Sequence, residues 1–138
     1  MWLRLLVILC ITMGFTSCRD DKNGAIYRIT IDQDGAYEPF RKQLILFASG
    51  GLYDEIKNEI IHKPIIEDKH FSGKKVSFKT REKIDVFVAT LSIHPKKEII
   101  NDNYILNVIV FKNDKMVYKE IVMCTPNMPY PHTIRISK

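Results

Sequence analysis

The feature that most constrains the fold of this chain is a pair of apolar runs, Tyr104 to Phe111 and Met116 to Met123, that flank Asn113 and Asp114. Runs rich in β-branched and aromatic residues on both sides of a short polar turn are typical of a β-hairpin. The sequence therefore predicts an antiparallel strand pair at the centre of a β-rich domain. A two-residue turn predicts that Phe111 lies opposite Met116, Val110 opposite Val117 and Ile109 opposite Tyr118.

Period-two alternation predicts further strands. Tyr27, Ile29 and Ile31 alternate with polar residues, as in a half-buried strand. Short strands with frequent turns indicate a β-sandwich. We expect residues 25–138 to form a single, mostly β sandwich of about seven strands with one short helix, of immunoglobulin-like or transthyretin-like topology. The other strands are predicted at Gln43 to Ala48, Lys75 to Thr80, Lys83 to Ile93 and Thr133 to Ser137, with Lys75 to Thr80 paired to Lys83 to Ile93 across Arg81 and Glu82.

One segment departs from the strand pattern. Leu52, Ile56 and Ile60 are spaced four residues apart, which would place them on one face of a helix. Acidic residues fall in what would be the first turn, where they interact favourably with the helix dipole, and Pro64 follows the segment. The spacing predicts a three-turn helix over Leu52 to His62.

Both faces of the predicted hairpin are apolar, whereas a sandwich strand with one solvated face carries polar residues on that face. The face that bears Ile109, Phe111, Met116 and Tyr118 therefore needs a cover. The predicted helix is the first candidate for that cover, and a bound partner is the alternative. We treat these four residues as the candidate partner surface.

The amino terminus predicts export and lipid attachment. Arg4 precedes an apolar run from Leu5 to Phe15 that is too short to span a membrane but is typical of a signal peptide. Thr16 and Ser17 before Cys18 resemble a bacterial lipobox, in which small residues precede the cysteine that receives the lipid. That resemblance implies that residues 1–17 are a lipoprotein signal peptide, that Cys18 is the lipidation site, and that residues 18–24 form a tether before the domain at residues 25–138.

The tether also suggests a location. Asp20 and Asp21 follow the cysteine closely, which resembles the surface-export pattern of Bacteroidota-type lipoproteins. The resemblance implies a lipid anchor in the bacterial outer membrane, on either the periplasmic side or the cell surface. A plain solvated linker is the alternative interpretation of the acidic pair.

The residues that carry chemistry form no known catalytic or metal-binding pattern. The sequence has no Gly-rich phosphate loop, HExxH pair, CxxC pair or G-x-S-x-G elbow. Glu67, Asp68 and His70 are close in sequence, and with His62 they could surround a divalent metal ion. A polar loop after Pro64 explains their spacing better, so we expect no metal site and no cofactor.

Nucleophilic catalysis is also disfavoured. Once Cys18 is acylated, Cys124 is the only thiol in residues 18–138, so an internal disulfide is excluded. Cys124 ends an apolar strand, where a small buried hydrophobic residue is the usual role. A dyad with His94 or His132 is the alternative.

These observations favour a lipid-anchored, non-enzymatic binding or structural module that recognises a protein or an envelope component. An inhibitor or immunity lipoprotein directed against a toxin or a wall-degrading enzyme is one alternative, and a small metal-assisted hydrolase is another. The formal charge of +5 is scattered along the chain, and with export this argues against nucleic acid as a partner. The expected partners are the membrane, through the lipid, and an unidentified protein or envelope component.

Overall fold

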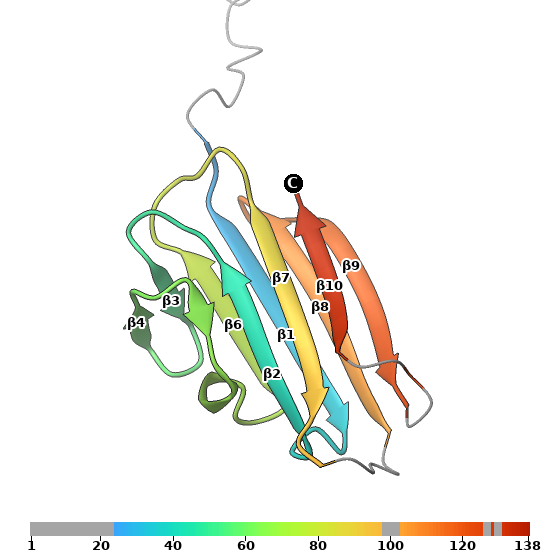
Figure 1. Cartoon of the computed structure of the whole chain (residues 1–138). Coiled ribbons are helices and arrows are strands. Elements are labelled where there is room, and N and C mark those ends of the chain that lie inside the picture. The colour runs from blue at the N-terminus through green and yellow to red at the C-terminus, as the bar shows by residue number, and fades with distance from the viewer. Residues whose placement is uncertain (1–23, 98–102, 126–127, 129–130) are drawn as a thin grey trace, which may run out of the picture.

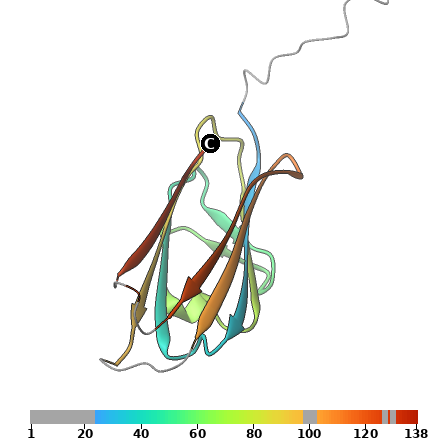
Figure 2. The same ribbon diagram turned by 90° about the vertical axis from the view of Figure 1, so that its right-hand side faces the viewer.

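The computed structural model describes residues 24–97, 103–125, 128 and 131–138. Two antiparallel sheets pack face to face in these residues (Figures 1 and 2). The larger sheet has the strand order β4-β3-β6-β1-β8-β9, and the smaller has the order β10-β7-β2-β5. The strands are β1 Tyr27–Gly35, β2 Phe40–Leu46, β3 Leu52–Asp54, β4 Glu59–Ile61, β5 Ile65–Ile66, β6 Lys75–Thr80, β7 Val88–Pro95, β8 Tyr104–Lys112, β9 Lys115–Cys124 and β10 His132–Ser137. The prediction of a mostly β sandwich is confirmed.

The core lies between the two sheets and is built from the alternating inward residues of each strand. Tyr27 of β1 stacks on Phe87 at a ring-centroid distance of 4.9 Å, and Phe40 of β2 packs on Tyr104 of β8 at 5.1 Å. All four side chains are fully buried or nearly so. Contacts between residues far apart in sequence therefore hold the two sheets together.

The predicted pairing of Lys75 to Thr80 with Lys83 to Ile93 is wrong. β6 pairs with β1 and β3 in the larger sheet, whereas β7 pairs with β2 and β10 in the smaller one. The chain crosses between the sheets after β6, and on the way Ile84 forms an isolated bridge with Ala25. Arg81 and Glu82 are thus part of a crossing segment and not of a hairpin turn.

The predicted helix over Leu52 to His62 is also wrong, because this segment forms the β3–β4 hairpin. Oδ1 of Asp54 accepts hydrogen bonds from the backbone N–H groups of Ile56 and Lys57, both at 3.0 Å. An aspartate that accepts such bonds can begin either a helix or a turn, so these bonds do not exclude the hairpin. Asn58 then adopts a left-handed conformation, with a φ of 58°, which closes the loop. Ile56 is 54% exposed and covers no sheet.

The central hairpin forms around Asn113 and Asp114, whose φ values of 47° and 64° are those of a type I′ turn. Phe111 lies opposite Met116 as predicted, but a β-bulge follows, and Val110 lies opposite Tyr118 instead of Val117. A one-residue slip exchanges the faces of a strand. The bulge therefore turns Val122 toward the core and leaves Ile121 64% exposed.

The single helical element in the described residues is the 3₁₀ turn η1, Asp68–His70, between β5 and β6. It lies at the lower end of the sandwich in both views, whereas the described chain begins at the upper end. Within the described part of the chain, no helix has the length and apolar character needed to cross a membrane.

Candidate metal centre and the network that positions it

Asp54 is the last residue of β3, and its side chain shares the core-facing side of that strand with Leu52. Only 1% of Asp54 is exposed. Its Oδ1 is used by the two backbone N–H groups of the β3–β4 turn. Its Oδ2 is buried and has no hydrogen-bond donor among the described residues. A buried carboxylate oxygen without a partner is strongly unfavourable, so this atom marks a candidate binding site.

Two further ligand-type side chains face Asp54. Glu59, the first residue of β4, lies directly opposite Asp54 in the hairpin register. His70, the last residue of η1, places its Nδ1 at 3.2 Å from Oε1 of Glu59, without the geometry of a hydrogen bond. One ligand atom from each of the three residues lies within 4.8 Å of the other two. Two carboxylates and an imidazole at this spacing form a candidate site for a divalent metal ion.

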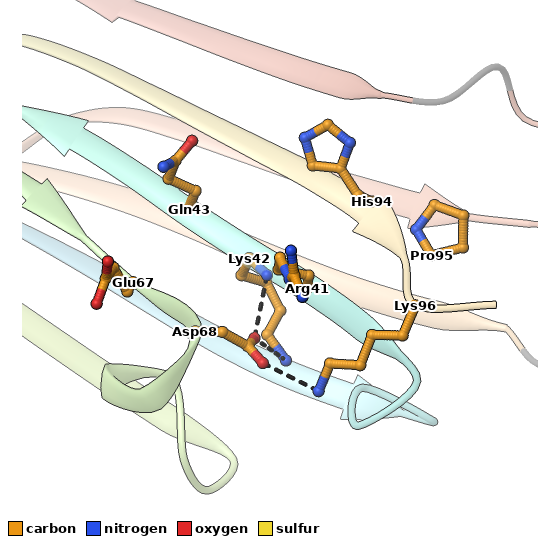
Figure 3. A pocket seen from close by; sticks show the side chains of 8 residues that line it. All are labelled: Arg41, Lys42, Gln43, Glu67, Asp68, His94, Pro95 and Lys96. Atoms are coloured by element: carbon orange, nitrogen blue, oxygen red, sulfur yellow. Dashed lines mark hydrogen bonds and ion pairs between the residues drawn. The ribbon is translucent and has the colours of Figure 1, made fainter.

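The position of His70 depends on Asp68, which is two residues earlier in η1. Oδ1 of Asp68 accepts a hydrogen bond from the backbone N–H of Lys42 at 3.1 Å and lies 3.2 Å from Nζ of the same residue. Oδ2 of Asp68 lies 2.9 Å from Nζ of Lys96. Figure 3 shows both ammonium groups directed at this carboxylate. Asp68 therefore joins η1 to β2 and to the residue that follows β7.

Asp68, Lys42 and Lys96 form an ion-pair group, and burial and contacts in this group shift the pKa values of Lys42 and Asp68. Burial lowers the pKa of Lys42 below its usual value, and the attraction of Asp68 only partly offsets that effect. Partial burial of Asp68 acts to raise its pKa, but hydrogen bonds from Lys96 and from the Lys42 backbone outweigh burial, so the pKa lies below its usual value. The attraction between Lys42 and Asp68 favours the charged form of each group, raising the pKa of the lysine and lowering that of the aspartate.

Hydrogen bonds fix the residues on either side of His70 as well. Nζ of Lys57, in the β3–β4 turn, donates to the carbonyl of Lys69 at 2.6 Å. The Nε2 of Gln33 donates to the carbonyls of Phe71 and Gly73, and its Oε1 accepts a hydrogen bond from the Tyr104 hydroxyl. These bonds come from the larger sheet, and with the contact between Asp68 and Lys42 of β2 they hold the segment that carries His70 against both sheets.

A cleft of about 580 Å³ adjoins the ion-pair group on the smaller sheet. Arg41 and Lys96 add positive charge to its rim, and Asp68 is already paired with two lysines. Figure 3 shows its lining side chains, which are Arg41, Lys42, Gln43, Glu67, Asp68, His94, Pro95 and Lys96. The ammonium groups of Lys42 and Lys96 occupy both oxygens of Asp68, so the cleft does not offer that carboxylate to a metal ion.

The structure separates the members of the candidate partner surface. Ile109 and Phe111 are half-buried on the outer side of β8, where the guanidinium of Arg28 lies 4.6 Å from the centre of the Phe111 ring. Met116 is 55% exposed at the start of β9. The bulge turns Tyr118 toward the core, against which its half-buried ring packs. Binding of a partner to these residues stays a prediction.

The four histidines are dispersed over the described part of the chain. Of the four residues considered for a metal from sequence, only His70 belongs to the candidate centre, while His62 lines a separate shallow depression beside β3. Cys124 is fully buried, and burial raises its pKa to about 11, which suits an inert core thiol. The predicted lipidation site, Cys18, lies outside the described residues.

Sequence reasoning missed Asp54 and Glu59, which were assigned to a helix. The available signal was an aspartate that ends a short apolar segment and is followed four residues later by asparagine. That pattern suits a hairpin whose loop is closed by a side-chain turn and a left-handed residue. In a hairpin of this length, Glu59 falls opposite Asp54.

Comparisons with known proteins agree with this fold. An NMR structure of the calcium-bound form of a protein from Parabacteroides distasonis is 24% identical, with a TM-score of 0.66 over 82% of this chain and 92% of that one. A crystal structure of a DUF4425 family protein from Bacteroides ovatus is 17% identical, with a TM-score of 0.66 over 83% and 95%. A crystal structure of a DUF4425 domain from Bacteroides vulgatus is 19% identical, with a TM-score of 0.65 over 83% of this chain and 94% of that one.

A family model also matches most of the chain. The model is described as PLAT/LH2 and C2-like Ca²⁺-binding lipoprotein, and it matches residues 3–128. No protein with curated annotation matches the chain.

Proposed function

Because the chain belongs to the family of PLAT/LH2 and C2-like Ca²⁺-binding lipoproteins, we propose that it is a lipid-anchored binding module of the bacterial envelope whose domain holds a divalent cation between Asp54, Glu59 and His70. The observation that carries the proposal is the buried Oδ2 of Asp54, which has no donor among the described residues, on a residue paired across the hairpin with a second acid, Glu59. A cation between the two acids would satisfy that oxygen and offset their repulsion.

The family description names Ca²⁺, and the residues fit that ion only in part. Ca²⁺ takes about six to eight oxygen ligands. Asp54 and Glu59 offer carboxylate oxygens, but the third group is an imidazole nitrogen, which is not a usual calcium ligand. The described side chains therefore do not make an all-oxygen site.

The bound ion would have a structural effect. Asp54 and Glu59 belong to the β3–β4 hairpin at the edge of the larger sheet, whereas His70 belongs to the connection that comes from the smaller sheet. An ion held by all three would tie the hairpin to η1. The cleft beside η1 has an excess of basic groups, and we propose it as the surface that binds an envelope partner. The link through the ion would limit the movement of η1 beside this cleft.

The anchoring part of the proposal concerns the amino terminus. We place the lipid on Cys18 and the protein in the outer membrane, on the evidence of the lipobox and of the acidic pair after it. The described chain begins at the end of the sandwich opposite η1 (Figure 1). A short tether entering there would direct η1 and the cation site away from the membrane.

Thermal unfolding of the purified full-length protein in detergent, after treatment with a chelator, tests the cation site. Saturation at a hundredfold the dissociation constant stabilises a folded protein by about 2.7 kcal/mol. We expect Ca²⁺, Mg²⁺, Mn²⁺ or Zn²⁺ to raise the melting temperature of the parent and not of Asp54→Asn. The amide keeps the Oδ1 that closes the turn but removes the charge.

Asp34→Asn is the matched control. Asp34 also accepts a backbone N–H through Oδ1, from Gly35 at 2.9 Å, but it is exposed and distant in the register from the site. This variant should respond to cations like the parent. A parent that none of the four ions stabilises, or an Asp54→Asn variant that responds fully, would contradict the proposal.

A further inference from the structure

We propose that this centre selects Zn²⁺ over Ca²⁺, through coordination by Nδ1 of His70. The inference rests on the proposed function, since it concerns the same three residues, and it departs from the ion that the family description names. It is carried by the ligand set, by the pairing of the neighbouring acids and by the way His70 is held.

The ligand set is mixed. Imidazole nitrogen is a preferred ligand of zinc and other first-row transition ions, whereas calcium and magnesium prefer oxygen. Zinc sites with three protein ligands and one water commonly combine histidine with a carboxylate. Two ligands on a tetrahedral zinc ion lie about 3.3 Å apart, and the 3.2 Å between Nδ1 of His70 and Oε1 of Glu59 matches that separation.

The neighbouring acids are in contact with other groups. Glu55 accepts a hydrogen bond from Oγ of Ser77 at 2.6 Å and lies 4.0 Å from Arg28. Glu67 lies 3.8 Å from Nζ of Lys69. The acidic residues next to the site in sequence are therefore paired with other groups, as is Asp68. Among the described side chains, only Asp54 and Glu59 offer carboxylates to the centre.

The centre has one enclosed side and one open side. The Asp54 side chain is buried and that of His70 is 15% exposed, whereas that of Glu59 is 47% exposed. An ion can therefore enter past Glu59, and water can take the remaining coordination position on that side. Three protein ligands and an open position suit a four-coordinate ion better than one that needs about six to eight ligands.

His70 is held for this role by residues that do not touch the ion. Asp68 is fixed by Lys42 and Lys96, and the carbonyl of Lys69 is fixed by Lys57. These contacts limit the movement of η1, so Nδ1 stays beside Glu59 and aimed toward the hairpin. A ligand that is already oriented loses little freedom when the ion binds.

Isothermal titration calorimetry on chelator-treated, full-length protein in detergent tests the selectivity, with ZnCl₂ and CaCl₂ as the probes. The variants are His70→Gln and, as a matched control, His62→Gln, which removes an exposed histidine outside the centre. We expect one Zn²⁺ per chain, bound more tightly than Ca²⁺. His70→Gln should weaken Zn²⁺ binding by more than about tenfold and leave any Ca²⁺ binding unchanged, while His62→Gln behaves like the parent.

Three results would overturn the inference in different ways. Tighter binding of Ca²⁺ than of Zn²⁺, with no effect of His70→Gln, would refute zinc selectivity but keep the cation site if Asp54→Asn abolishes the signal. Binding of neither ion would refute the site itself. Zn²⁺ binding that His62→Gln removes and His70→Gln preserves would assign the zinc to another surface.

Discussion

Asp54 and Glu59 lie directly opposite each other across the β3–β4 hairpin, and Nδ1 of His70 lies beside the Glu59 carboxylate. Two acids in such a cross-strand position repel each other. Oδ2 of Asp54 is buried and has no donor among the described residues. The hairpin thus carries an arrangement that is unfavourable alone and becomes favourable with a cation, and the following predictions depend on this relationship.

Glu59→Gln should have opposite effects with and without an ion. In chelator-treated protein at mildly alkaline pH, removing one of two opposed charges should stabilise the fold by about 0.5 kcal/mol. The stabilisation that Zn²⁺ gives the parent should shrink, because a carboxylate ligand is lost. Urea unfolding of both proteins, with and without Zn²⁺, measures this. Destabilisation of the ion-free variant would instead make Glu59 a purely structural partner of His70.

Lys42→Met should destabilise the fold and also weaken metal binding at a distance. The Lys42 side chain is 3% exposed and lies 3.2 Å from Asp68. Losing a contact to a charged group costs about 1.5–3 kcal/mol, since Asp68 keeps its contact with Lys96, and η1 would be held less firmly around His70. Denaturant unfolding and a Zn²⁺ titration measure the two effects.

Lys69→Met is the control for that experiment. Lys69 is 72% exposed and its contact with Glu67 spans 3.8 Å, so its loss should change the free energy of unfolding by about 0–1 kcal/mol. If both variants lose equal stability, Asp68 is not the residue that fixes η1.

Acid should weaken the fold through Asp68. Its pKa is lowered in the folded protein from a model-compound value of 3.8. Its contribution to stability is therefore fully present above that value and is lost as the pH falls through the lower, folded value. Urea unfolding between pH 6 and about pH 2.5 should show a smaller decline in Asp68→Asn than in the parent. Identical declines would assign the acid sensitivity to other groups.

Cys124 should be inert in the native protein. Burial raises its pKa to about 11, and the side chain is inaccessible, so a polar alkylating reagent should modify it slowly under native conditions and rapidly in denaturant. Mass spectrometry after timed exposure to iodoacetamide measures this. Rapid native labelling would show that β9 opens readily at its end.

The parts of the fold that could be predicted from sequence are those set by local patterns. The alternation in β1 and the turn at Asn113 and Asp114 predicted strands that the structure contains. The bulge between Val110 and Phe111 could not be predicted, because the local turn pattern fixes only the first pair, Phe111 and Met116. The partners of β6 were missed because strand order in a sandwich is set by contacts between distant segments.

The candidate centre could not be predicted from sequence, because its residues meet only in the folded chain. The spacing of Leu52, Ile56 and Ile60 fits a helix as well as a hairpin, and the left-handed conformation of Asn58 and the pairing of β3 with β6 distinguish the hairpin. His70 comes from a different connection, and only the folded chain brings it to Glu59. Its approach depends on the buried pairing of Lys42 with Asp68, which the sequence pattern does not indicate.

X-ray diffraction from crystals grown with Zn²⁺, measured on both sides of the zinc absorption edge, tests the central claim most directly. We predict one anomalous peak at about 2.0–2.2 Å from Oδ2 of Asp54, a carboxylate oxygen of Glu59 and Nδ1 of His70. The same peak should be missing from crystals of Asp54→Asn. A zinc-loaded crystal in which Asp54, Glu59 and His70 surround no anomalous density would contradict the account.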